Sequence, residues 1–192
     1  MIYPTAYFPS IQYLRGVCSN DHCTIDSKEH WVKQSIRNRA EILTAEGVQR
    51  LVVPVIHHQE KQAIHEVKIA EDGWEVKHWR AIKTAYGKAP FFEAYDLEIQ
   101  SLLLNKPPYL LELNQRILTF FINAWELPIQ PSETSSFLPY ASNDLRLRNW
   151  LERISSKEYQ QVFSYNKPFT PNLSALDLLF CEGPLGRNFI LD

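Results

Sequence analysis

The sequence predicts a mixed α/β fold, with α+β as the alternative, in which a small mixed sheet from the N-terminal half is packed by three to five helices. Short apolar or alternating runs of strand length dominate the chain before residue 70. Further along, apolar residues recur every three or four positions, the period of an amphipathic helix. With 192 residues, 45% of them hydrophobic, the chain can bury one sizeable core, and a single domain over residues 1–192 is expected.

Strand-like segments come mostly early in the chain: residues 2–8, 23–26, 29–43, 51–56, 63–69 and, after the helices, 159–163. Residues 29–43 are ambiguous between helix and strand, and their β-branched and aromatic residues favour strand. Pro54 indicates a sheet edge or the end of a ladder. Residues 63–69 alternate in polarity, which predicts a half-buried strand with His65 on its apolar face.

Helix signals mark residues 11–17, 79–89, 91–104, 107–125 and 174–182. Ser10 is expected to cap the first helix, and Ser174 with Asp177 resembles a capping box at the start of the last. Pro90 and Gly183 are stop signals for two of them. The polar, irregular stretch 129–148 is interpreted as a mobile lid.

Composition excludes several classes of protein. The formal charge of −2 offers no excess positive potential for nucleic acid or anionic lipid, so any anion site must be local. No apolar run reaches the ~20 residues of a membrane span, and the N-terminus does not read as a secretory signal. Three cysteines, an odd number, suggest free thiols in a reducing compartment, and we expect a cytoplasmic protein. No phosphate loop, dinucleotide fingerprint, nucleophile elbow or zinc helix is present, and no cofactor is expected.

The main candidate for a functional surface is the cationic run from Lys33 to Arg39. If this run is extended, Lys33, Ser35, Arg37 and Arg39 share one face and suit a phosphate or carboxylate, for which arginine offers a planar fork of donors. The alternative is a solvated strand face balanced by neighbouring acids.

Histidines supply the candidate acid–base groups. His78, beside Arg80 on a predicted helix, borders a buried stripe and could act on an anionic substrate, or simply pack. His30 lies just before the cationic run, and Asp26 follows a short strand. Cys18 and Cys23, even with nearby histidines, match no usual zinc spacing, so no metal site is expected. A weaker hypothesis is a thiol hydrolase or transferase in which Cys18 or Cys23 acts as the nucleophile with a histidine.

Several ordered segments resemble the WbqC-like protein family. They are residues 6–13, 30–39, 52–55, 64–67, 78–82 with 85–86 and 89–92, and a tail over 159–163 and 171–180 that looks like the version found in Bacteroides-type bacteria. The chain departs from many relatives at Thr5-Ala6 and Ser10, where a glutamine-proline pair and a second proline are common. It also has Cys181 where many carry asparagine.

The resemblance implies a transferase-type enzyme of surface polysaccharide or modified-sugar biosynthesis that acts on a small anionic substrate, either a nucleotide sugar or a carrier-linked group. The alternative is a non-catalytic binding or assembly protein of the same pathway. The expected catalytic residues are His78, His30 and Asp26. The expected substrate-binding residues are Tyr7, Lys33, Gln34, Arg37, Asn38, Arg39, Arg80 and Tyr86. Convergence of the acid–base groups and Arg39 on one cleft favours the enzyme, and scattering favours the binding protein.

Overall fold

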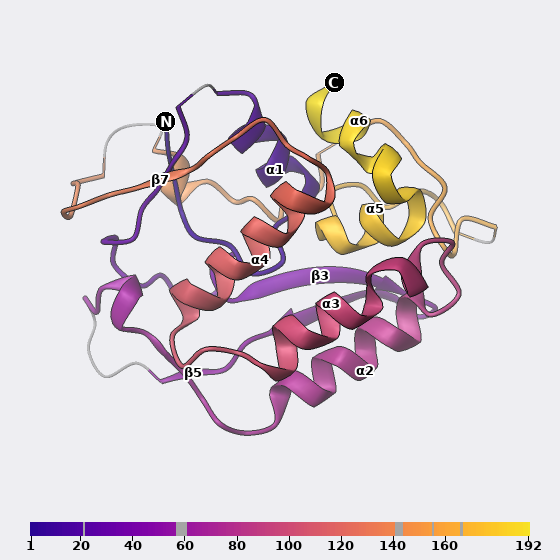
Figure 1. The fold of residues 1–192 in the computed structure, drawn as a ribbon, viewed down its shortest axis with the longest axis horizontal. Helices are drawn as coiled ribbons and strands as arrows, with labels where there is room; N and C mark the ends of the chain where they lie inside the picture. Colours follow the sequence, from indigo (N-terminus) through magenta and orange to yellow (C-terminus); the bar gives the residue numbers. More distant parts are fainter. Residues whose placement is uncertain (21, 57–60, 141–143, 155, 166) are drawn as a thin grey trace.

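The computed structural model describes residues 1–20, 22–56, 61–140, 144–154, 156–165 and 167–192. It confirms a mixed α/β fold, with six α-helices and three small sheets among these residues (Figure 1). The predicted single small sheet is therefore divided. Its strands pair in three separate groups, and five of the seven strands in the described residues are only two residues long.

The first sheet joins three short parallel strands in the order β1, β2, β7, formed by Ile2–Tyr3, Thr24–Ile25 and Ser132–Glu133. Helix α1 (Ile11–Cys18) connects the first two strands. As predicted, Ser10 caps it, and its Oγ accepts a hydrogen bond of 3.3 Å from the Tyr13 amide. Strand β7 was not expected, because residues 132–133 are polar and exposed. This strand is held by backbone pairing with β2 and not by burial of its side chains.

The second sheet is a hairpin of β3 (Arg39–Thr44) and β4 (Gly47–Val52), in register from Arg39 opposite Val52 to Thr44 opposite Gly47. Pro54 separates it from β5 (Val55–Ile56), which pairs with β6 (Lys68–Ile69). The predicted strand over 63–69 is wrong in its first half. Residues Ile64–Glu66 form a 3-10 turn, and the His65 Nδ1 atom lies 3.1 Å from the Ser27 carbonyl.

Four further helices lie close to where the sequence predicts them, and a fifth, after the predicted stop at Gly183, was not expected. They are α2 (Trp74–Tyr86), α3 (Phe92–Leu104), α4 (Leu110–Ala124), α5 (Ala175–Glu182) and the short α6 (Gly186–Leu191), with 3-10 turns at Leu145–Leu147 and Gly183–Leu185. Figure 1 shows α2 and α3 side by side below the hairpin, with α4 crossing in front. Within the described residues, no helix is long and apolar enough to span a membrane.

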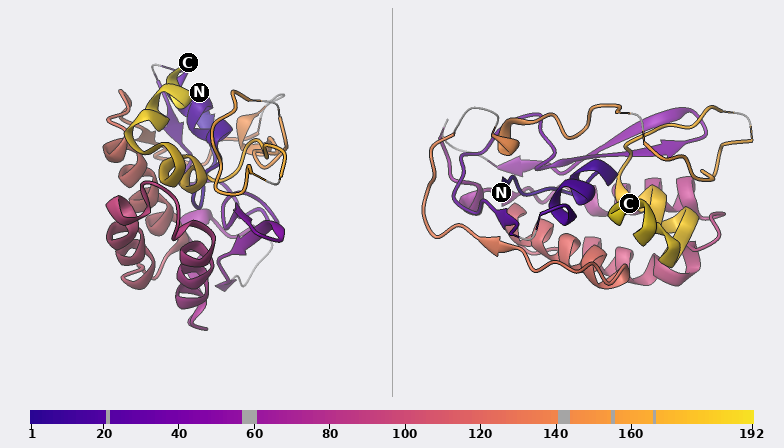
Figure 2. Two further views of the ribbon diagram at one scale, coloured as in Figure 1. Left: turned by 90° about the vertical axis from the view of Figure 1, so that its right-hand side faces the viewer. Right: turned by 90° about the horizontal axis from the view of Figure 1, so that it is seen from above.

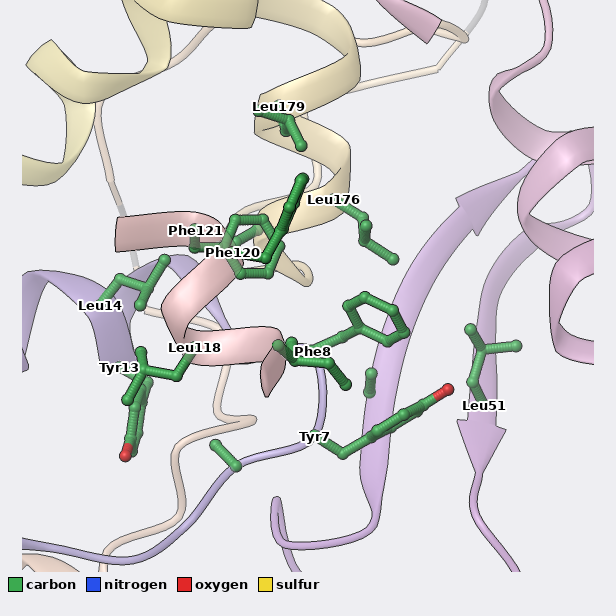
Figure 3. Packing of buried hydrophobic residues seen from close by; sticks show 14 of the residues in the cluster. Tyr7, Phe8, Tyr13, Leu14, Leu51, Leu118, Phe120, Phe121, Leu176 and Leu179 are labelled. Atoms are coloured by element: carbon green, nitrogen blue, oxygen red, sulfur yellow. The ribbon is translucent and has the colours of Figure 1, made fainter. Parts of the chain in front are cut away.

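Buried residues from Tyr3 to Ile190 form one hydrophobic cluster, and the N-terminal segment runs through its middle. Tyr7 and Phe8 are fully buried between α4, α5 and the hairpin (Figure 3). Ring contacts continue from Phe8 through Phe121 to Trp125 on α4. Both chain ends lie near α1, as two further views show (Figure 2).

A buried carboxylate, Asp177 on α5, joins α2 to the segment that contains Tyr159 and Gln161. It accepts hydrogen bonds from the Tyr86 hydroxyl (2.9 Å), the Tyr159 hydroxyl (2.6 Å) and the Gln161 amide (2.9 Å). The strand predicted over residues 159–163 does not form. Tyr159 and Gln161 hold this segment through their side chains instead of through a backbone ladder.

Gly183 ends α5 in the left-handed region, with φ +54°, and a Cβ there would lie 2.4 Å from the Phe91 ring. Gly73 has a similar φ of +72° but open space around its Cα. We therefore expect Gly73→Ala to cost about 1 kcal/mol of unfolding free energy from backbone strain alone. Gly183→Ala should cost about 3 kcal/mol, because overpacking against Phe91 is added to a strained backbone with φ +54° and ψ −130°. Urea unfolding of both variants measures the difference, and equal costs would contradict the close contact with Phe91.

Candidate functional site

The run that the sequence singled out forms one wall of a pocket. Residues 32–37 face residues 146–151 across a hollow of about 320 Å³. The second wall comes from the stretch predicted to be a lid. A volume of this size is typical of a site for a small ligand.

The cationic run is a turn-rich loop, so the strand predicted over residues 29–43 is wrong before Arg39. Gln34 lies in the left-handed region at φ +57°, and the Ser35 hydroxyl donates to the Val32 carbonyl at 2.7 Å. This local bonding competes with a sheet ladder. As a result Lys33, Ser35 and Arg37 do not project from one strand face. Lys33 and Gln34 are exposed, whereas Arg37 turns inward.

Arg37 is 1% exposed and forms a two-pronged ion pair with Glu29, which is fully buried. Its Nε donates to Glu29 Oε1 at 2.8 Å and its Nη2 donates to Oε2. The same Nη2 reaches the Arg146 carbonyl at 3.1 Å, and the Asn114 amide of α4 donates to the Arg37 carbonyl at 2.8 Å. Removing one partner of such a pair leaves a buried charge uncompensated, at a cost of roughly 3–5 kcal/mol.

A second buried pair lies directly beside the first. Arg146 Nη1 donates to Asp26 Oδ2 at 2.5 Å, and the same guanidinium pairs with Asp144. Asp26 Oδ1 accepts from the Thr134 hydroxyl at 2.7 Å and from the Lys28 amide at 2.9 Å. Asp26 is therefore a structural counter-ion whose carboxylate is enclosed by donors.

The pocket-forming end of the predicted lid is anchored by Arg146. This side chain also donates to the carbonyls of Leu138 (2.8 Å) and Pro139 (3.1 Å), and the Tyr140 ring lies 4.4 Å from its guanidinium carbon. Residues 135–139 are exposed, and residues 141–143 lie outside the described part of the chain. An anchor this well bonded does not support lid motion at residues 144–150.

Burial raises the pKa of Glu29 to about 7, even though the Arg37 guanidinium opposes this shift. The pKa of Arg146 is raised by its hydrogen bonds to Asp144 and Asp26, against the opposing effect of burial. Two guanidinium groups therefore meet three carboxyl groups, of which Glu29 titrates near neutral pH. The buried cluster has no net positive charge to offer a ligand.

Cations without an acidic partner among the described residues lie at the pocket surface. Within the described residues Lys33 forms no ion pair. Arg148 stacks on Trp150 at 4.6 Å, and the one hydrogen bond of its side chain there is donated to the Gln12 amide oxygen. Arg39 lies close in sequence to this wall, and its Nε is buried without a hydrogen-bond partner in the described structure. By strand register Arg39 shares a face with Glu41, whose carboxylate pairs with Arg50 and with Arg153.

None of the histidines that the structure describes lines this pocket. His78 on α2 is buried and its Nδ1 lies 2.8 Å from the Tyr7 hydroxyl, while its ring also hydrogen-bonds to the backbone of Val52. Burial lowers the pKa of His78 to about 4. His30 stacks on Phe137, with ring centroids 4.6 Å apart. The two expected proton-transfer residues and Asp26 are thus distributed over three separate environments.

The remaining predicted binding residues are also distributed. Asn38 donates to the Val53 carbonyl at 2.8 Å, Tyr86 bonds Asp177, and Arg80 is exposed on the outer face of α2. The pKa of the Cys18 thiol and that of the Cys23 thiol are each raised by burial to about 11, which is unfavourable for a nucleophile. Of the predicted set, Lys33, Gln34 and Arg37 line the pocket.

Sequence reasoning missed Glu29, Arg146, Arg148 and Trp150. Glu29 was interpreted only as a charge balancing a surface strand. Arg146 and Arg148 lay in the stretch 129–148 that was interpreted as a lid, and Trp150 lay just beyond it. A usable signal was present, because three arginines stand within residues 146–153 of a chain with few basic clusters. Asp26, Gln12 and Glu41, which these arginines contact, lie more than 100 residues earlier, however, and spacing along the chain does not reveal such contacts.

Comparisons with known proteins agree with the resemblance. Residues 5–161 match the model of the WbqC-like protein family. An uncharacterised protein of Mycobacterium tuberculosis, Rv1507c, is 26% identical over 219 aligned residues, which cover 96% of this chain and 94% of that protein. No solved structure matches the chain.

The near-neutral pKa of Glu29 predicts a specific pH dependence of stability. A carboxyl group whose pKa is raised in the folded state stabilises the fold below its unfolded value, and this contribution is lost as pH rises through the folded value. The unfolding free energy of the wild type, minus that of Glu29→Gln, should therefore fall by about 3 kcal/mol between pH 4.5 and 7. Urea titrations at several pH values measure this difference, and parallel pH profiles would contradict it.

Proposed function

The chain belongs to the WbqC-like protein family, and we propose that it binds the anionic part of a small or carrier-linked substrate in the pocket between residues 32–37 and 146–151. One observation carries this proposal: the only charged side chains exposed in the described lining are the cations Lys33 and Arg148. Their charge is not neutralised by an acid in the described part of the structure.

The buried network supports anion binding indirectly. Because Arg37 and Arg146 are paired with Glu29, Asp26 and Asp144, they hold the two walls together without adding free charge. The positions of Lys33 and Arg148 are thereby fixed on opposite walls. An anion between them would gain charge-assisted hydrogen bonds from both sides.

A phosphate-bearing ligand suits this geometry better than a neutral one. The pocket also presents the Gln34 and Asn149 amides, and its hollow of about 320 Å³ can hold a diphosphate with part of a sugar. Nucleotide sugars and carrier-linked groups of surface polysaccharide or modified-sugar biosynthesis are the substrate classes that we propose. The family resemblance supports this choice of pathway.

Binding is the function that the geometry supports best, because His30, His78 and Asp26 do not meet in the pocket. A transferase is a second candidate, and one observation favours it. The carboxyl of Glu29 has a pKa of about 7 and bonds the side chain of Arg37, a residue of the pocket wall. Buried acids that titrate near neutral pH are frequent at catalytic sites.

We expect Lys33→Gln and Arg148→Gln each to weaken binding of a nucleotide sugar about tenfold, because each removes one charge-assisted contact. Calorimetry with UDP-N-acetylglucosamine and dTDP-glucose, together with thermal shifts, measures the effect. Lys77→Gln removes an equivalent cation from the exposed face of α2 and should leave affinity unchanged. No binding by the wild type, or equal loss in all three variants, would overturn the proposal.

The same ligands separate the two candidates. If the protein is a transferase that uses Glu29, Glu29→Gln should abolish turnover. It should also weaken nucleotide-sugar binding, because it breaks the ion pair with Arg37 in the pocket wall. Turnover that survives in Glu29→Gln would exclude this role for the carboxyl. Binding without turnover in the wild type would leave the binding protein as the function.

A further inference from the structure

A second hollow region lies at the C-terminal end of α2, away from the pocket described above. Two adjoining cavities of about 500 and 400 Å³ meet at Lys88, Val162 and Phe163, which line both. One extends beneath Ala89 and Pro90 of the α2–α3 turn, and the other reaches Thr44 of the β3–β4 turn. We call this combined hollow the α2 groove. It shares no lining residue with the first pocket.

The charges that line the α2 groove are of one sign. Lys83 and Lys88 are exposed, and the described lining contains no aspartate or glutamate. Neither lysine has an acidic partner among the ion pairs of the described residues. This contrasts with a chain in which acids outnumber bases, 22 to 20. The lysines thus form a local positive field with nothing in the described structure to neutralise it.

The rest of the lining is mainly apolar. Phe163 and Val162 form the ridge between the two cavities, Pro90 and Ala85 lie on the helical side, and Tyr165 at the rim is 78% exposed. Few polar groups accompany them, chiefly hydroxyl and amide groups of Thr44, Thr84 and Gln160. An apolar hollow with a few placed polar groups is the usual form of a ligand site.

Hydrogen bonds to the surrounding structure hold the walls of the α2 groove in place. Gln161 is 2% exposed, donates to Asp177 and exchanges hydrogen bonds with the Thr170 backbone. The Lys167 ammonium donates to the Ala45 carbonyl in the hairpin turn. On the helical side, the Phe91 amide donates to the Phe180 carbonyl at 3.0 Å. The groove is therefore largely preformed, which reduces the entropy lost when a ligand binds.

We propose that the α2 groove is a binding site for an amphipathic anion, a carboxylate or phosphate monoester that carries a short acyl or aromatic group. The acid group lies between Lys83 and Lys88, and the apolar part covers Val162 and Phe163. Lysine is suited to this role because its ammonium is a compact point charge that can donate hydrogen bonds to a carboxylate or to a phosphate. The inference rests on residues that the proposed nucleotide-sugar site does not use, so either can fail without the other.

The test uses decanoate and decyl phosphate as probes, with decanol as the uncharged analogue and inorganic phosphate as the anion without an apolar part. Binding is followed on the intact chain by calorimetry and by amide shifts in ¹H–¹⁵N NMR spectra. Both amphipathic anions should bind and shift the amides of Lys88, Val162 and Phe163. Decanol and inorganic phosphate should bind at least about tenfold more weakly, because each lacks one of the two contacts.

Variants identify the groups responsible. Lys83→Gln and Lys88→Gln should each weaken decanoate binding about fivefold, the effect of losing one solvent-exposed charge contact. Phe163→Ala should weaken decanoate and decyl phosphate alike. Lys77→Gln on another face of α2, and Lys33→Gln in the other pocket, should change neither. Because Lys83 and Lys88 are exposed, their replacement is not expected to unfold the chain.

Three outcomes would overturn the proposal. Decanol binding as tightly as decanoate would show that the lysines contribute nothing. Equal weakening by Lys77→Gln and Lys83→Gln would show attraction to general surface charge. Amide shifts confined to residues 32–37 and 146–151 would place both anions in the first pocket instead.

Discussion

Two buried ion pairs, Arg37 with Glu29 and Arg146 with Asp26, fix segments of the chain that are far apart in sequence. Arg146 reaches 120 residues back to Asp26, and the guanidinium of Arg37 bonds the carbonyl of Arg146 itself. Asp26, Glu29 and Arg37 lie outside any helix or strand, and Arg146 lies in a single 3-10 turn. Charge-assisted bonds in a low-dielectric interior therefore perform the role that apolar packing performs elsewhere in the molecule.

This arrangement explains why the pocket exists. A loop of residues 32–37 with few backbone bonds would collapse onto the core or remain open without a partner. Asn114 of α4 holds it from one side and Arg146 from the other. Such a network is sensitive to loss of any member, because the remaining charge cannot be solvated. Because Arg37 and Arg146 are paired with buried acids, neither is free to bind a ligand. The exposed cations Lys33 and Arg148 remain for that role.

The sequence predicted those parts of the fold that depend on local signals. Ser10 and Ser174 cap the helices that they were expected to cap, and the apolar stripe from Leu110 to Phe121 lies on the buried side of α4. Prediction failed where side chains override backbone preference. Residues 33–38 have a strand-like composition but form turns held by Ser35 and Arg37, and Tyr159 and Gln161 bond Asp177 instead of pairing as a strand. For the site, Lys33, Gln34 and Arg37 could be placed from sequence, whereas their partners across the pocket depend on tertiary contacts.

The pocket between residues 32–37 and 146–151 and the α2 groove lie at opposite ends of strand β3 of the hairpin. Arg37 of the first pocket precedes β3 by two residues, and Thr44 of the α2 groove ends it. Six residues of strand separate the sites by about 17 Å. One face of β3 carries Arg39 and Glu41, and Glu41 is tied to Arg153, which follows the pocket wall. The part of the chain that follows the pocket wall thus contacts the hairpin at both places, through Arg153 at Glu41 of β3 and through Lys167 at the Ala45 carbonyl of the β3–β4 turn.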